Sequence, residues 1–170
     1  ITRSIKWKEI DEMVNGGLDL MAFIAFVMLV AGGYANVLNT SGAVVHLVND
    51  TAAMMEGASL VVSAIVLLAI GLVITMGIGT SFGTIPVVAA IYVPLAQQLG
   101  FSKSAIILLI GIAAALGDAG SPASDSTMGP TSGLNADGQH DHIMDTCVPT
   151  FIAFDVFLVI GGVIGSVLLS

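Results

Sequence analysis

Two short polar segments interrupt an apolar sequence, and they contain the residues best able to do chemistry. Residues 117–127, with the sequence GDAGSPASDST, hold two Asp, three Ser and one Thr. Residues 79–84, with the sequence GTSFGT, hold three hydroxyls and no charge. Carboxylate, hydroxyl and carbonyl oxygens are the ligands that hard cations prefer. These residue types therefore indicate a site for a cation or a small polar substrate.

The first segment follows an apolar run, 105–116, that is too short to cross a bilayer, since a spanning helix needs about 20 apolar residues. This pattern is typical of a broken helix, which offers unwound carbonyls at one end and a positive dipole at the next helix start. We expect Asp118 and Asp125 to bind Na⁺ and to exchange it for a proton. The predicted hydroxyl ligands are Ser121, Ser124, Ser126 and Thr127. The alternative is a surface loop whose Asp and Ser residues cap helices.

The second segment follows a strongly apolar run, 60–76, and its Gly, Thr and Pro residues favour a break in the helix. Helix is expected to resume over residues 87–99. Two arrangements are compatible with this pattern: a span followed by a re-entrant helix, or a helical hairpin with GTSFGT at its tip. Its uncharged backbone could complete a cation site or bind an anionic group through N–H donors. The alternative is an ordinary turn.

The composition indicates an all-α membrane protein. Of the 170 residues, 56% are hydrophobic and 9% are charged, whereas soluble domains carry about 25% charged residues. The mean hydropathy is +1.01. Spans are expected over 18–38, 60–76 and 148–169, so the partner is the lipid bilayer of a plasma (bacterial inner) membrane. A net charge of −8 with only four Lys and Arg excludes a basic patch for nucleic acid.

Other polar residues allow a functional and a structural interpretation. Asn36 ends the first expected span, either as a helix cap or as part of a substrate path. His140, Asp141, His142 and Asp145 are expected in a solvated loop, with pH sensing as the alternative. Asp155 lies about two turns into the last span and is expected to be interfacial rather than functional. The chain begins at Ile1 without Met, so we expect a piece of a longer protein.

Three motifs resemble the NhaC-type Na⁺/H⁺ antiporter family and its YuiF-like amino-acid-transporter relatives. GDAGSPASDST is similar to the family's G-D-x-x-S-P-x-S-D-[ST]-T signature, and GTSFGT is similar to its G-T-S-[FW]-G-T break. Asp141-His142 resembles the family's D-H pair before the last span. The run from Gly129 to Thr150 looks closer to the YuiF-like branch. The resemblance covers the chain from Gly16 onward, as the C-terminal half.

This resemblance implies half of an inverted-repeat secondary transporter, whose site lies between re-entrant or broken helices of each half. The N-terminal half of the same transporter would be the partner, and a homodimer is kept open. Carried onto this chain, Asp118, Asp125 and the hydroxyls beside them would bind the ion or substrate. The residues expected opposite them are Gly79, Thr80, Ser81 and Thr84.

The leading functional hypothesis is Na⁺/H⁺ antiport, with Na⁺ and H⁺ as coupling ions and no other cofactor. The alternative is an amino-acid or carboxylate transporter coupled to Na⁺ or H⁺. A channel or a structural membrane subunit is a third class, which would need no proton-exchanging carboxylate. No nucleophile–base pair or metal set indicates an enzyme.

Overall fold

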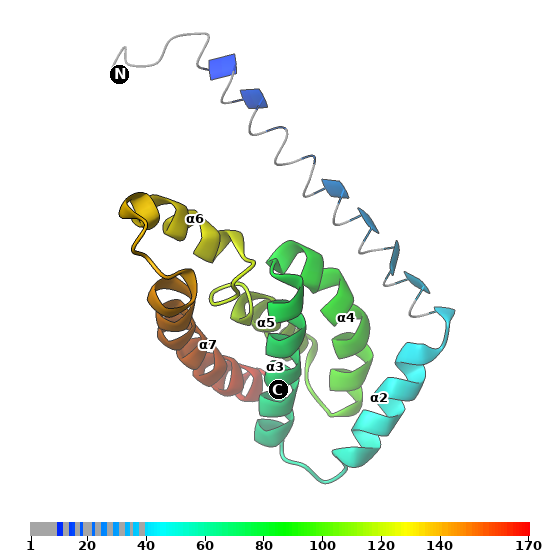
Figure 1. Ribbon diagram of the computed structural model, residues 1–170. Coiled ribbons are helices and arrows are strands. Elements are labelled where there is room, and N and C mark those ends of the chain that lie inside the picture. The colour runs from blue at the N-terminus through cyan, green and yellow to red at the C-terminus, as the bar shows by residue number, and fades with distance from the viewer. Residues whose placement is uncertain are drawn as a thin grey trace.

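The computed structural model describes residues 40–170 and scattered positions between 10 and 37. The described residues form helices and connecting turns, with no strand among them. The scattered positions before residue 40, which include part of the expected first span, are helical where described. The elements are α2 (Ala43–Met54), α3 (Leu60–Ile78), α4 (Ser81–Gln98), α5 (Lys103–Leu116), α6 (Asp125–Leu134), a 3₁₀ turn η1 (Asn135–Asp137), a π-helix η2 (His142–Cys147) and α7 (Val148–Leu168) (Figure 1).

Helices α3 and α4 form an antiparallel hairpin that is packed against α5. The hydroxyl of Tyr92 on α4 donates to the Leu67 carbonyl on α3. Helix α5 runs parallel to α3, because Gly71 lies opposite Ala113 and Gly117 lies opposite Thr75. Small residues allow helix backbones to approach closely where lipid supplies no hydrophobic drive between them. The apolar core therefore sits among these three helices.

Helix α7 runs antiparallel to α5 and covers the side of α3 away from α4 (Figure 1). Gly165 lies opposite Leu108, and the Ser102 hydroxyl donates to the Leu169 carbonyl at 2.6 Å. Two stretches are long and apolar enough to cross a membrane, Leu60–Ile78 and His142–Leu168. The outer face of α7 exposes large apolar side chains, including Phe157. This face suits contact with lipid or with a further part of the protein.

The prediction that helix resumes at residue 87 is wrong. Helix resumes at Ser81, so the break between α3 and α4 is confined to Gly79 and Thr80. Of these two residues, Gly79 adopts a left-handed conformation, at φ 74°, and Thr80 is extended. Pro86 lies inside α4 and Thr84 donates its hydroxyl to the Thr80 carbonyl at 2.8 Å, which ties the first turn together. Proline is tolerated there because neighbouring groups satisfy the freed backbone.

Two polar stretches, 40–58 and 131–146, are largely helical. The polar connection 40–58 contains α2, whose Val44 and Val48 pack into the core, while His46 is exposed on that helix. The stretch 131–146 contains the end of α6, η1 and most of η2, so the last helical stretch begins at His142 rather than Val148. In the first segment Val44 and Val48 supply a buried face that composition alone does not reveal, whereas in the second Ile143 and Met144 are exposed and Thr146 is buried.

The contact between α5 and α3 at Gly117 gives a test of this packing. A Cβ atom at residue 117 would lie 2.5 Å from Thr75 Cβ and would also overlap the Met76 backbone nitrogen. We expect Gly117→Ala to lower the free energy of unfolding by about 1–3 kcal/mol, as overpacking does. The measurement is the Tm of the full-length protein in detergent.

The matched control is Gly111→Ala on the same helix, where an added Cβ meets nothing within 4 Å. Equal Tm values for the two variants would contradict the close approach of α5 and α3.

Candidate functional site

One carboxylate joins the two predicted helix breaks. The Ser81 hydroxyl, at the first residue of α4, donates to Asp118 Oδ2 at 2.5 Å. The Ser124 hydroxyl donates to Asp118 Oδ1. The Ser126 hydroxyl donates to the Asp118 carbonyl at 2.6 Å. Side chains from both breaks therefore converge on Asp118.

The ends of four helices meet around this carboxylate. Ser81 begins α4, and Ser124 is the N-cap of α6, its Oγ accepting the Ser126 N–H at 3.1 Å. Helix N-termini carry partial positive charge and stabilise a nearby anion. The C-terminal ends of α3 and α5 are also adjacent, since Ser81 Oγ lies 3.2 Å from the Ala114 carbonyl. Hydroxyl donors and helix starts therefore surround the Asp118 carboxylate, next to carbonyls that attract a cation.

A cavity of about 390 Å³ opens beside Asp118. Its polar side chains are Ser81, Asp118, Ser126 and Thr150. Its apolar wall includes Phe154 and Leu158 of α7. A volume in this range accommodates a small organic molecule as well as a hydrated ion.

The other predicted hydroxyls bond mainly to backbone carbonyls. Thr127 donates to the Ser124 carbonyl at 3.0 Å, and its hydroxyl also contacts the Ser121 carbonyl. The Ser121 hydroxyl donates to the Met76 carbonyl at 3.3 Å, which links the second break to the end of α3. Gly79 contributes close packing, because a Cβ there would lie 3.2 Å from Ala123 Cβ. Together with Thr80 and Thr84, these residues hold the shape of the two breaks.

Two predicted site residues lie apart from this cluster. Asp125 is exposed on the first turn of α6 and is not among the residues lining the cavity. Asn36 is also exposed, and the contact described for it is its carbonyl accepting the Thr40 hydroxyl at 2.9 Å. Both remain predictions for contacts with parts of the protein beyond the described residues.

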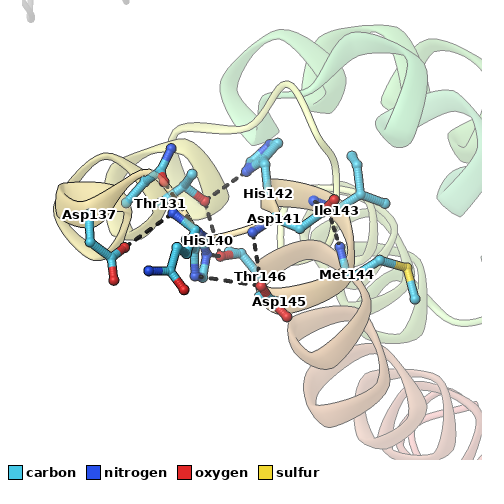
Figure 2. A network of polar contacts seen from close by, with 11 residues as sticks. Thr131, Asp137, His140, Asp141, His142, Ile143, Met144, Asp145 and Thr146 are labelled. Atoms are coloured by element: carbon cyan, nitrogen blue, oxygen red, sulfur yellow. Dashed lines mark hydrogen bonds and ion pairs between the residues drawn. The ribbon is translucent and has the colours of Figure 1, made fainter.

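The expectation of a solvated loop before α7 is only partly correct: Asp141 and Asp145 are exposed, but η2 begins at His142 and both histidines make side-chain contacts. His142 Nδ1 lies 2.7 Å from the Thr131 hydroxyl, and that hydroxyl contacts Thr146 at 3.0 Å (Figure 2). His140 Nε2 approaches the same Thr146 hydroxyl at 2.6 Å (Figure 2). His142 Nε2 donates to the Pro122 carbonyl at 2.8 Å, since a carbonyl can only accept. The network therefore ties η2 and α6 to the second break.

Asp155 is not interfacial in this structure. It is 2% exposed, and neither carboxylate oxygen has a hydrogen-bond partner among the described residues. Its side chain lies on the α7 face that packs against α3 and α5. The signal in the sequence is its spacing from Gly162 and Ser166, which are buried on the same face.

Two helical stretches among the described residues have the length and hydropathy of membrane spans, which is what an integral membrane protein requires. The family model of the Na⁺/H⁺ antiporter family matches residues 1–166, so the chain belongs to this family. A Bacillus subtilis protein named "Putative amino acid transporter YuiF" is 59% identical over 165 residues, covering 97% of this chain and 37% of the relative.

Two further relatives are described as uncharacterized membrane proteins. The Vibrio parahaemolyticus protein is 52% identical over 97% of this chain and 37% of its own length. The Haemophilus influenzae protein is 52% identical over 96% of this chain and 36% of its own length. The chain therefore spans little more than a third of the relatives that it matches. No solved structure matches it significantly.

The link from His142 to the second break can be tested by substitution. His142→Phe fills a similar volume but removes the donor to Pro122 and the partner of Thr131. We expect the free energy of unfolding to fall by about 1–3 kcal/mol, because two hydrogen bonds are lost at a half-buried side chain. The readout is the Tm of the full-length protein in detergent.

The control is His46→Phe on the exposed surface of α2. A His142→Phe protein as stable as this control would show that the network does not support the break.

Proposed function

We propose that the full-length protein containing this chain is a secondary active transporter and that Asp118 binds the cationic group of its cargo. The observation that carries the proposal is the convergence of Ser81 and Ser124 on this one carboxylate. Broken helices that meet beside an anionic side chain are a recurring site design in such transporters. The remaining part of the full-length protein, proposed as an N-terminal inverted repeat, would close the open side of the cavity.

Na⁺/H⁺ exchange in a plasma membrane is the first candidate chemistry. Na⁺ is a hard cation, and the cavity presents the Asp118 carboxylate with the hydroxyls of Ser81, Ser126 and Thr150. The Ala114 carbonyl lies beside Ser81 and could complete the set. Membership of the Na⁺/H⁺ antiporter family supports this chemistry.

Amino-acid transport coupled to Na⁺ or H⁺ is the second candidate, and the cavity favours it. A volume of about 390 Å³ exceeds the need of a bare ion. The wall formed by Phe154 and Leu158 would suit an aliphatic side chain, while Asp118 would pair with an ammonium group. The name of the Bacillus subtilis relative supports the same cargo.

The role of Asp118 can be tested in proteoliposomes of the full-length protein. Asp118→Asn keeps the shape of the side chain but removes its charge, so cation binding should be lost. We expect both radioactive Na⁺ flux and labelled amino-acid uptake to fall to the level of protein-free liposomes. Asp137→Asn, at an exposed position of η1, should transport normally. Full transport by correctly folded Asp118→Asn would overturn the assignment.

A comparison of two probes separates the cargo candidates. An imposed pH gradient should drive radioactive Na⁺ uptake without added amino acid if the protein is an antiporter. Uptake of one member of a labelled amino-acid panel, with no Na⁺/H⁺ exchange in its absence, would identify the second candidate.

Asp125→Asn should lower the active flux only partially, because Asp125 is exposed outside the cavity. Complete loss in that variant would place Asp125 in the transport site itself.

A further inference from the structure

Asp155 is the buried carboxylate that the site around Asp118 does not use. It lies on α7, is 2% exposed, and has no hydrogen-bond partner for either oxygen within the described part of the chain. Buried ionisable groups in a spanning helix are costly and are a functional hypothesis by default. The described helices alone bury the Asp155 side chain, without a contribution from another part of the protein.

The depth of Asp155 follows from its neighbours on α7. One turn earlier, Phe151 packs against Gly120 in the second break. Two turns later, Gly162 packs against Leu68 and Ile112. Asp155 is therefore level with the C-terminal end of α5, where the helix gives way to the break. The adjacent residue, Phe154, lines the cavity, whereas Asp155 is not among the lining residues.

No Lys or Arg of the described helices packed against α7 lies within reach of Asp155. Helix α3 carries no titratable residue, and α5 carries only Lys103, exposed at its first position. Because Ser102 bonds to Leu169, Lys103 lies near the other end of α7, roughly 20 Å from Asp155 by helix rise. The remaining titratable residues nearby are Asp118 in the break and, on η2, His142, Asp145 and Cys147.

The surroundings also fit a proton better than Na⁺. A Na⁺ ion would need several oxygen ligands, but the Thr75 hydroxyl on α3 is committed to the Gly71 and Ala113 carbonyls at 2.8 and 2.6 Å. The other buried hydroxyl of α3, Ser63, lies three turns away. A protonated carboxylic acid is neutral and can be buried at far lower cost than a carboxylate.

We propose that Asp155 is the proton-binding carboxylate of this transporter, separate from the cation-binding Asp118. The inference rests on the proposed transport function and assigns one role to each carboxylate. Hydroxyl donors bond to both oxygens of Asp118, whereas Asp155 is buried with no partner for either oxygen within the described residues. Loss of the proton leaves an uncompensated charge between α7 and the α3–α5 pair. That charge favours a conformation in which Asp155 gains water or a partner, which couples proton release to helix movement.

Infrared difference spectra of the reconstituted full-length protein test proton binding without a cargo. At acidic pH the wild type should show the C=O stretch of a protonated carboxylic acid with few hydrogen bonds, and this band should vanish as the pH rises. Asp155→Asn should lack the band, while Asp118→Asn should keep it. Persistence of the band in Asp155→Asn, or its absence from the wild type, would overturn the proposal. Asp155→Glu keeps a carboxyl group, so the band should remain at a shifted frequency. This variant controls for misfolding of Asp155→Asn.

A transport assay is the second test, with radioactive Na⁺ and the labelled amino-acid panel as probes. Asp155→Asn should still carry the active probe down its own gradient, but a pH gradient should no longer drive its accumulation. Continued pH-driven accumulation would overturn the proposal. If wild-type protein carries neither probe but the infrared band depends on Asp155, the transport function fails while proton binding stands.

Discussion

The structure depends on satisfying polar backbone groups where two helices stop inside an apolar bundle. A bilayer offers no water to the carbonyls and N–H groups freed at such ends. The chain solves this by bringing both breaks together, so that each supplies partners to the other. Ser81 from the first break and Ser124 from the second donate to Asp118, and Ser121 donates to the Met76 carbonyl at the end of α3. The same contacts that make the breaks tolerable also create a polar cavity.

The sequence predicts the two breaks well but not their extents. A 12-residue apolar run ending at Leu116 can only be a partial span, so α5 and its end follow from length alone. The extent of the break at GTSFGT is harder to predict. Gly83 and the following Pro86 discourage helix in isolation, but both lie inside α4. Close packing and the Thr84–Thr80 hydrogen bond override that preference. Local propensity therefore locates the interruption, and tertiary contacts decide that it involves only Gly79 and Thr80.

Residue type also predicts the site better than it predicts the roles within it. Asp118, Ser81, Ser124 and Ser126 form the expected cluster. Thr84 and Thr127 have the same chemistry, yet their hydroxyls bond to nearby carbonyls. The difference lies in the direction of each side chain, which the sequence does not contain.

Asp155 shows how environment can divide labour between identical side chains. A single carboxylate that alternates between proton and cation must be accessible to both, which limits how dry its surroundings can be. Two carboxylates at similar depth remove that limit, because one can be surrounded by hydroxyl donors while the other is buried away from them. Phe154 and Leu158 of α7 line the cavity, whereas Asp155 on the same helix is buried and does not. Coupling between Asp118 and Asp155 would then depend on the position of α7. This helix contributes Phe154 and Leu158 to the cavity beside Asp118, and it carries Asp155 itself.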